Sequence, residues 1–446
     1  MSSAVATDLE AIRARVAELM TARLPDHIAR LEWDDERRAA HQTERLRALL
    51  AHAVRRSPFH ARRLADVDPS TFEVADLGRL PTMTKAEMME DYDDVVTDRR
   101  LTRPLVEEHL AASTREPSLL LGEYVCLASG GSSGLRGIFV QSLEDYAEFC
   151  CSIVRRTMAR LAAFGGPPPG GITLGMVAAA SPVHSTAFGA MTARGPVNVD
   201  SIPSTLPIDE IVARLNELQP PAMQGYPSKL VHLAAEQRAG RLQISPFAVT
   251  ATSEMSTPED RALIGEAFGV PVVNQFGSTE GLVGHSEAGE DVLVFADDMC
   301  LVEVVDPTKV LVTNLHNRTQ PLIRYELNDC FEVVPGDGPL RARVKGRVDD
   351  ILRYGDVEVQ PFAIRTVMVA EPAVIEYQVR QTERGADVSI VRDGDVDEDA
   401  LAARLADALG KAGVADPAVT LETVDAIPRH AETGKAKRFV PLPARG

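Results

Sequence analysis

The stretch LASGGSSGLRGIFV, residues 127–140, places a loop rich in glycine and serine between two apolar segments. The loop from Ser129 to Gly137 contains four glycines, three serines and one cation, Arg136. Glycine lets the backbone approach a ligand closely, and successive exposed N–H groups can form an anion-binding nest to which serine hydroxyls add donors. Neither common nucleotide fingerprint is present. The loop is therefore a candidate phosphate site, and the alternative is a plain hairpin or linker.

Four later stretches carry residue types suited to a nucleotide. In VVNQFGSTEG, residues 272–281, an apolar strand runs into an aromatic, a threonine and a glutamate. Strands of α/β sheets open at their carboxyl ends onto ligand crevices, where a ring can stack on a base and a carboxylate can hold Mg²⁺. The other stretches are PLIRYELND (321–329), whose Asp329 could take ribose hydroxyls, GRVDDILRYGDVEVQP (346–361), and ETGKAKRF (432–439), with a lysine in a glycine-containing loop.

Each of these residues also has a simpler explanation. Glu280 and Asp329 could be helix caps or solvated loop carboxylates, and Lys435 could be one more surface lysine. The order and spacing of all five stretches favour a shared site.

The elements that must position these residues follow from hydrophobic periodicity. Residues 36–66 are predicted helical, with Pro58 stopping the run, and Thr84 with Glu87 forms a possible capping box. The alternation further along favours a mostly parallel α/β arrangement, followed by antiparallel strands from about Asp291. Helices are predicted over 143–163, 208–218, 228–238, 258–268 and 398–410, and strands over 172–178, 249–252, 270–273, 388–391 and 419–424.

Composition and charge limit the possible partners. The chain has 446 residues, 45% hydrophobic and 25% charged, which is typical of a globular protein of two or three domains. A formal net charge of −18 argues against nucleic acid or an anionic membrane as the main partner. No apolar run reaches the length of a membrane span, and the charged N-terminus does not resemble a secretory signal. The five cysteines include no C-x-x-C pair, so buried thiols in a reducing cytoplasm are expected.

Taken together, the five stretches resemble the adenylate-forming enzymes, which include acyl-CoA synthetases, adenylation domains of peptide synthetases and luciferases. Within this superfamily the chain is most similar to the phenylacetate-CoA ligase branch. The similarity extends to ERLRALLAHAVRRSPFHARRL and RLPTMTKAEM near the N-terminus and to LVTNLHNRTQPLIRYELND. It implies an α/β fold with a large domain of mixed α/β sheets and a β region, residues 1–345, and a small mobile α+β lid domain, residues 346–446.

The resemblance also implies roles for individual residues. The glycine-rich loop would hold the β- and γ-phosphates of ATP. Phe276 would stack near the adenine, Thr279 would contact the α-phosphate, and Glu280 would ligate Mg²⁺. Lys435, on the small domain, would be the catalytic lysine. The implied nucleotide set is Ser129, Gly130, Gly131, Ser132, Ser133, Gly134, Arg136, Phe276, Gly277, Asp329 and Arg347, with the last two near the ribose and Asp349 as the hinge.

The implied reaction has two steps. A small carboxylic acid attacks ATP to give an acyl-adenylate and pyrophosphate, and the acyl group then passes to the thiol of CoA. ATP, Mg²⁺ and CoA are the expected cofactors, and a cytoplasmic location with no nucleic-acid or membrane partner is expected.

Three positions depart from the pattern of the superfamily. Leu135 and Gly137 stand where a lysine is usual, and the nearby cation is Arg136. Phe276 replaces the usual tyrosine, and Glu326-Leu-Asn-Asp329 replaces the usual Arg-Thr-Gly-Asp. The residues implied to be catalytic are all retained. We expect the three departures to affect the affinity for ATP and the rate.

The acid pocket is expected between the middle strands and the aromatic-glycine stretch. Small residues beside aromatics would admit a flat aryl or a branched acid. A lone histidine such as His184 is more often a satisfied loop histidine than a substrate contact. The candidates are His184, Phe188, Tyr226, Pro227, Ala251 and Thr252.

Two alternatives to a CoA ligase remain open from the sequence. The adenylate could pass to a carrier-protein thiol or to an amine. The chain could also be a catalytically impaired nucleotide-binding homologue. Retention of Glu280, Asp329, Arg347 and Lys435 argues against the impaired homologue, and the altered loop at residues 135–137 keeps it open.

Overall fold

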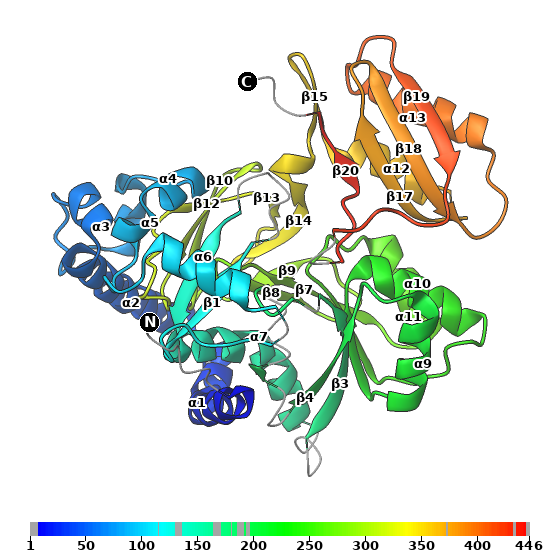
Figure 1. Cartoon of the computed structure of the whole chain (residues 1–446). Helices are drawn as coiled ribbons and strands as arrows, with labels where there is room; N and C mark the ends of the chain where they lie inside the picture. Colours follow the sequence, from blue (N-terminus) through cyan, green and yellow to red (C-terminus); the bar gives the residue numbers. More distant parts are fainter. Residues whose placement is uncertain are drawn as a thin grey trace.

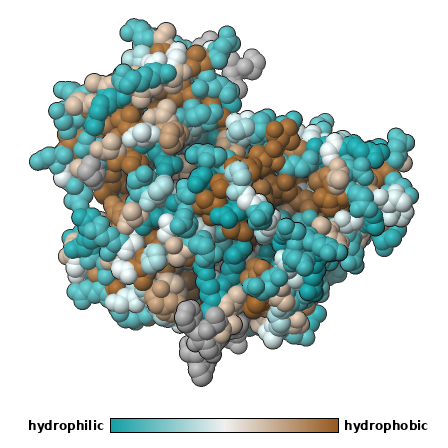
Figure 2. Space-filling view, turned by 180° about the vertical axis from the view of Figure 1, so that it is seen from behind, coloured by the Kyte–Doolittle hydropathy of each residue, from teal (hydrophilic) through white to brown (hydrophobic). Residues whose placement is uncertain are grey.

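The computed structural model shows a large unit that carries the N-terminus and a small unit formed by the C-terminal part of the chain (Figure 1). Seen from behind, the surface is mostly hydrophilic, with apolar residues in separate patches (Figure 2). No helix in the described ranges is long and apolar enough to cross a membrane. The structure describes residues 8–114, 116–129, 136–163, 171–179, 181–184, 191–192, 197–371, 373–430 and 434–442.

The first part of the large unit is helical. The helix expected over 36–66 is two helices, because Ser57 accepts a hydrogen bond from the backbone N–H of His60 and Pro58 starts a new helix. The expected capping box of Thr84 and Glu87 is confirmed. The helices are α1 (Leu9–Ala29), α2 (Asp35–Arg56), α3 (Pro58–Arg63), α4 (Lys85–Glu90), α5 (Tyr92–Val95) and α6 (Arg103–Ala112).

A nine-stranded sheet forms the centre of the large unit. Its order is β13-β14-β9-β8-β7-β6-β5-β3-β4. The strands from β7 to β4 pair in parallel, and those from β7 to β13 pair antiparallel, so the two parts of the sheet join at β7. The parallel strands are β3 (Ile172–Ala178), β4 (Val197–Pro203), β5 (Ala222–Gly225), β6 (Ala248–Thr252) and β7 (Val272–Gly277).

Three helices cover one face of the parallel strands, α9 (Ile208–Leu218), α10 (Pro227–Arg238) and α11 (Pro258–Phe268) (Figure 1). Ile211, Leu230 and Ile264 of these helices pack against Met223 and Val249 of the sheet. The other face is turned toward α1 and α7 (Leu143–Ala163). Helices α7, α9 and α11 have the bounds expected from the sequence.

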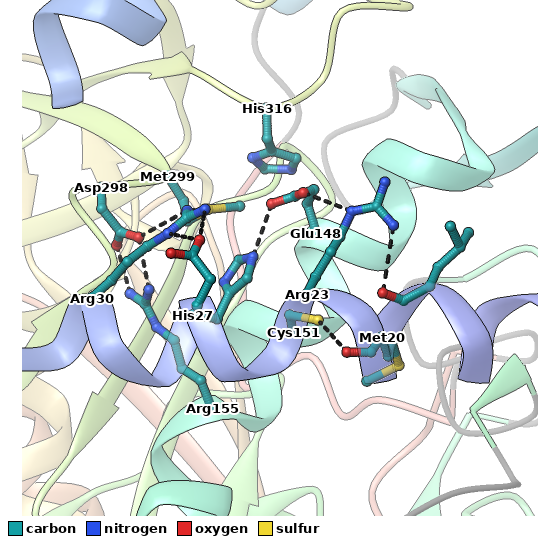
Figure 3. A network of polar contacts seen from close by, with 12 residues as sticks. Met20, Arg23, His27, Arg30, Glu148, Cys151, Arg155, Asp298, Met299 and His316 are labelled. Carbon is teal, nitrogen blue, oxygen red and sulfur yellow. Dashed lines mark hydrogen bonds and ion pairs between the residues drawn. The ribbon is translucent and has the colours of Figure 1, made fainter.

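A network of polar contacts fastens α1 to α7 (Figure 3). Glu148 of α7 accepts a hydrogen bond from Arg23 at 2.9 Å and bonds His27 at 2.8 Å. Arg155, also on α7, forms a two-bonded ion pair with the buried Asp298 at 2.6 and 2.8 Å. Because all these groups are paired, and Arg155, Asp298 and His27 are also buried, they fix how α7 lies against the rest of the unit.

The antiparallel part follows as expected from the sequence. β10 to β12 form a separate three-stranded sheet, and β1 (Tyr124–Ala128) and β2 (Ile138–Ser142) form a hairpin around the glycine-rich loop. The remaining strands are β8 (Val283–Ser286), β9 (Leu293–Phe295), β10 (Cys300–Asp306), β11 (Lys309–Asn314), β12 (Tyr325–Leu327), β13 (Asp329–Val333) and β14 (Arg341–Arg347).

The small unit has a core of its own that runs from Leu352 to Phe439. Its main sheet has the order β19-β18-β17-β20 and is accompanied by two helices and a short hairpin. β14 continues to Arg347, one residue beyond position 346, where this domain was expected to start. Its elements are β15 (Leu352–Tyr354), β16 (Val357–Val359), α12 (Pro361–Val369), β17 (Val374–Gln381), β18 (Gly385–Arg392), α13 (Glu398–Lys411), β19 (Ala418–Thr423) and β20 (Phe439–Val440).

Candidate active site

A cleft of about 340 Å³ lies beyond the carboxyl ends of β6 and β7, where the small unit meets the large one. Ligands of α/β sheets bind at such strand ends. Nine of the residues singled out from the sequence line this cleft: Ser129, His184, Phe276, Gly277, Thr279, Glu280, Asp329, Arg347 and Lys435.

The turn after β7 presents Thr279 and Glu280 to the cleft. The backbone N–H of Ser278 donates to the carbonyl of Leu282 at 3.0 Å and closes the turn. Asn314 of β11 donates through its amide to the backbone carbonyl of Glu280 at 2.7 Å. The Phe276 ring is held edge-on by Phe295 and Phe331, with centroids 5.7 Å away in both cases. The position of the turn is therefore fixed by the bond from Asn314 and by the ring packing of Phe276.

Asp329 and Arg347 face each other on paired strands. They are register partners in the β13–β14 ladder. Burial raises the pKa of Asp329 to about 6, a rise that the charge of Arg347 limits and the charge of Glu280 increases. Arg347 also lies 3.5 Å from the carboxylate of Asp349, the expected hinge residue, which accepts a hydrogen bond from the amide of Asn328.

Lys435 reaches the cleft from the small unit. Its ammonium lies 5.6 Å from the centre of the Tyr226 ring. Burial lowers the pKa of Lys435 to about 8, an effect that the carboxylate of Glu254 opposes and the charge of Arg347 reinforces. Because that value lies above 7, the ammonium carries its charge at neutral pH in most molecules.

The glycine-rich loop is described only at its two ends. Ser129 and Gly137 bond each other twice, through Ser129 N–H to the Gly137 carbonyl at 2.9 Å and through Gly137 N–H to the Ser129 hydroxyl at 2.8 Å. Arg136 is exposed and is not among the residues that line the cleft, although its charge helps lower the pKa of His184. Five loop residues expected to bind phosphate lie outside the described residues: Gly130, Gly131, Ser132, Ser133 and Gly134.

The residues expected to form the acid pocket lie in different places. His184 lines the cleft and is 4% exposed, and its pKa is lowered well below the ordinary value by burial and then by the charge of Lys435. Tyr226 is buried beneath Lys435, and its hydroxyl accepts a hydrogen bond from the Ala179 N–H at 3.0 Å.

The remaining acid-pocket residues are set back from the cleft. Pro227 is the buried first residue of α10. Ala251 packs in the core beneath α9 to α11 and lines no part of the cleft, and Thr252 is buried beside it on β6. Phe188 lies outside the described residues.

Two functional candidates at the end of β6 were missed. Glu254 accepts the backbone N–H of Ala436 at 3.1 Å with one oxygen and that of Ser228 at 3.3 Å with the other. It therefore joins the loop of Lys435 to the start of α10. Ser253, beside it in the cleft lining, has a φ of 66°, a conformation that costs energy in a residue other than glycine. The signal was available, since both residues follow a buried strand just as the turn after β7 does.

Comparisons with known proteins show which proteins this chain resembles. No family model matches the chain. A phenylacetate-coenzyme A ligase of Thermus thermophilus is 25% identical over 389 residues, which are 77% of this chain and 78% of that protein. A structure of 2-hydroxyisobutyryl-CoA ligase in the postadenylation state matches with a TM-score of 0.68 and 17% identity over 93% of this chain and 91% of that one. The same ligase in its thioesterification state gives a TM-score of 0.54 over 92% and 90%.

The fold is that of the adenylate-forming ligases, and the resemblance to this superfamily is confirmed. Within it, the sequence similarity is to phenylacetate-CoA ligases, over more than three quarters of both chains.

Proposed function

We propose that the protein activates a carboxylic acid with ATP and transfers the acyl group to CoA, as an AMP-forming acid–thiol ligase. The observation that carries this proposal is the meeting of Lys435, from the small unit, with Thr279, Glu280 and Asp329 in one cleft. An overall arrangement more similar to the postadenylation form than to the thioesterification form of the related ligase supports it.

In the first half-reaction, a carboxylate oxygen of the acid attacks the α-phosphorus of ATP. The bond from that phosphorus to the oxygen bridging to the β-phosphate breaks, and pyrophosphate leaves. Two anions must meet, so positioning and positive charge supply most of the catalysis. The ammonium of Lys435 would stabilise the charge that develops on the phosphoryl oxygens, and Thr279 would bind the α-phosphate.

The nucleotide would be held by groups on both sides of the cleft. Phe276 would lie against the adenine, and Asp329 would accept hydrogen bonds from the ribose hydroxyls beside Arg347. A pKa of about 6 leaves Asp329 ionised in most molecules at pH 7, as an acceptor must be.

The residues fit a magnesium ion held partly by the substrate. Within the described ranges, no group of three or more His, Cys, Asp or Glu side chains could hold a metal. Mg²⁺ is commonly bound by one or two carboxylates together with substrate phosphates, and Glu280 in the cleft supplies such a carboxylate. The ion would add positive charge at the phosphoryl oxygens.

In the second half-reaction, the CoA thiol loses its proton and its sulfur attacks the acyl carbonyl. The bond between that carbon and the AMP oxygen breaks, and AMP leaves. We expect the small unit, which has a core of its own, to move away from the large unit and withdraw Lys435 before this step.

Pyrophosphate release with and without CoA tests the proposal. We expect release that depends on the acid with a suitable member of a panel of aryl, branched and straight-chain acids, and acyl-CoA only when CoA is added. Lys435→Ala should lower adenylate formation by about 10²–10³, the range for loss of one preorganised charge. Thioester formation from supplied acyl-adenylate should be largely retained. Lys411→Ala, on α13 and away from the cleft, is the control. Equal losses in both half-reactions would refute the role of Lys435.

A further inference from the structure

The chain that leads from the end of β11 to β12 buries four amide and hydroxyl side chains. We call residues 314–320, NLHNRTQ, the connector. A buried polar group costs free energy unless it is hydrogen-bonded, so the partners of these side chains show what the connector holds. The four are Asn314, Asn317, Thr319 and Gln320, each at most 7% exposed.

One end of the connector fastens β2, the strand that follows the glycine-rich loop. β1 and β2 form a sheet of two strands, so β2 has a second edge that no strand covers. Gln320 accepts the N–H of Val140 at 2.8 Å and donates to the carbonyl of Ile138 at 3.0 Å. Asn317 donates to the carbonyl of Val140 at 3.0 Å. Because buried backbone groups need partners, these side chains take the place of a third strand.

The other end of the connector fastens the turn after β7. The Asn314 amide donates to the carbonyl of Glu280 at 2.7 Å, and its oxygen accepts the backbone N–H of Asn317 at 2.9 Å. The oxygen of Asn317 in turn accepts the N–H of Gln320 at 3.2 Å. Each asparagine therefore orders the backbone three residues after it, a pattern typical of this side chain in turns.

Three hydrogen bonds thus connect the turn to the hairpin of β1 and β2. They run from the Glu280 carbonyl to Asn314, from Asn314 to the N–H of Asn317, and from the Asn317 amide to the Val140 carbonyl. Asn317 is 6% exposed and takes part in two of the three bonds. A buried polar network whose members are bonded to one another holds one arrangement.

We propose that Asn317 is a positioning residue for adenylation, because it holds the hairpin of the glycine-rich loop at a fixed distance from the turn of Thr279 and Glu280. This inference rests on the proposed function, in which the loop would bind the β- and γ-phosphates of ATP and the turn the α-phosphate and Mg²⁺. The bond that breaks lies between these two groups of phosphates. AMP and acyl-adenylate have no β- or γ-phosphate, so their binding does not depend on this distance.

Asn317→Ala tests the assignment by cutting the connection between hairpin and turn. In calorimetric titrations, ATP affinity should fall about 10-fold or more and AMP affinity should stay as in the wild type. The value of kcat/KM for ATP in adenylate formation should also fall about 10-fold or more, since a misplacement of about 1 Å can cost about 10²-fold. Acyl-CoA formation from supplied acyl-adenylate should be retained. A merely structural role would lower both half-reactions alike.

The matched control is Asn216→Ala on α9, away from the cleft. Asn216 also joins two backbone groups, because its amide donates to the carbonyl of Arg241 at 2.9 Å and its oxygen accepts the N–H of Gln243 at 2.7 Å. Its loss should change neither the affinity for ATP nor that for AMP.

Thr319→Val is a second variant, for the case that Asn317→Ala does not fold. The Thr319 hydroxyl accepts the N–H of Ser142 on β2 at 3.1 Å, and valine removes this acceptor at nearly the same volume. Loss of one hydrogen bond should weaken ATP by about 2- to 10-fold and leave AMP unchanged.

The outcomes separate this inference from the proposed function. Equal losses of ATP and AMP affinity in the two variants, or no loss of ATP affinity in either, would overturn the inference. If the wild type then still forms acyl-CoA, the proposed function stands. A selective loss of ATP affinity in a protein that releases pyrophosphate with no acid would keep the role of Asn317 in nucleotide binding and refute the ligase activity.

Discussion

At the scale of single residues, Lys435 is a half-buried cation in the lining of the cleft. Its pKa of about 8 follows mainly from burial, and Glu254 keeps it from falling further. An amine with such a pKa loses its charge within a pH range that most enzymes tolerate. The group that would neutralise the developing phosphoryl charge is thus also a titrating group.

The pH dependence of adenylation should show this titration. Lys435 is charged below its pKa and neutral above it, so kcat/KM for ATP in the first half-reaction should fall as the pH rises through about 8. Pre-steady-state formation of acyl-adenylate between pH 6 and 10 measures it. In Lys435→Arg, the guanidinium stays charged and the alkaline fall should vanish, even if the rate is lower. An unchanged alkaline limb in that variant would show that another group titrates.

Glu280 offers a separate residue-scale prediction. If its carboxylate holds Mg²⁺, Glu280→Gln should lower adenylate formation by about 10²-fold and raise the Mg²⁺ concentration needed for half-maximal rate. Glu326→Gln removes a charge from the same cleft and should leave the Mg²⁺ titration much closer to that of the wild type. Identical Mg²⁺ curves for Glu280→Gln and the wild type would remove Glu280 from the metal site.

The sequence predicted individual residues best where a motif gave both type and position. Lys435, Glu280 and Asp329 were expected together and line one cleft. Ala251 and Thr252 were expected to share a pocket, but neighbouring residues of a strand point to opposite faces, and Ala251 packs beneath the helices. Glu254 was missed because it belongs to no motif. Its place just after a buried strand could have indicated it.

At the scale of elements, the turn after β7 depends on Gly281. Its φ is 101°, and a side chain there would lie 2.8 Å from the His316 ring. The same turn carries Glu280, whose carbonyl is held by Asn314. The backbone at this point therefore has neither the conformation nor the space for another residue.

Gly281→Ala should consequently destabilise the fold by about 1–3 kcal/mol and reduce adenylate formation by displacing Glu280. Thermal unfolding and the first half-reaction measure the two effects. Gly240→Ala is the matched control, since Gly240 also has a positive φ, 73°, but a side chain there would meet nothing within 4 Å. A loss in Gly281→Ala no larger than in Gly240→Ala would contradict the steric argument.

Elements were predictable where one local pattern decided them. The helices at 143–163, 208–218 and 258–268 were expected with the bounds that the structure has. Helix α1 was not, because its buried side includes His27 and its neighbour Arg23 bonds Glu148 on α7, more than a hundred residues away. A helix that packs through long-range polar contacts gives a weak periodic signal in its own sequence.

At the scale of the whole molecule, a few contacts hold the small unit over the cleft. Glu254 bonds the N–H of Ala436, and Arg438 lies 3.4 Å from Asp260 of α11. His232 of α10 bonds the buried Glu376 of β17 at 3.2 Å. Burial alone would raise the pKa of Glu376, but the bond from His232 and the charge of Arg429 lower it. The strand order of the central sheet and the docking of the small unit both depend on contacts between residues far apart in the sequence. Neither was predicted from the sequence.

His232→Ala should weaken the docked arrangement without touching the pair of Glu376 and Arg429. Loss of one hydrogen bond, about 0.5–1.5 kcal/mol, should slow adenylate formation by about 2- to 10-fold. Acyl-CoA formation from supplied acyl-adenylate should not fall. His109→Ala also removes one bond, to the Ser118 carbonyl, but within the large unit, and should change neither step. Equal slowing of both half-reactions by His232→Ala would argue against a role in docking.

The alternation along β7 has a consequence for how such a protein can diversify. Asn274 and Phe276 line the cleft, and Val273 lines only the cavity on the face turned toward α1 and α7. Successive codons of β7 therefore carry different constraints, one set from the cleft and the other from the face turned toward α1 and α7. A substitution at Val273 can therefore change that face without altering the residues that line the cleft.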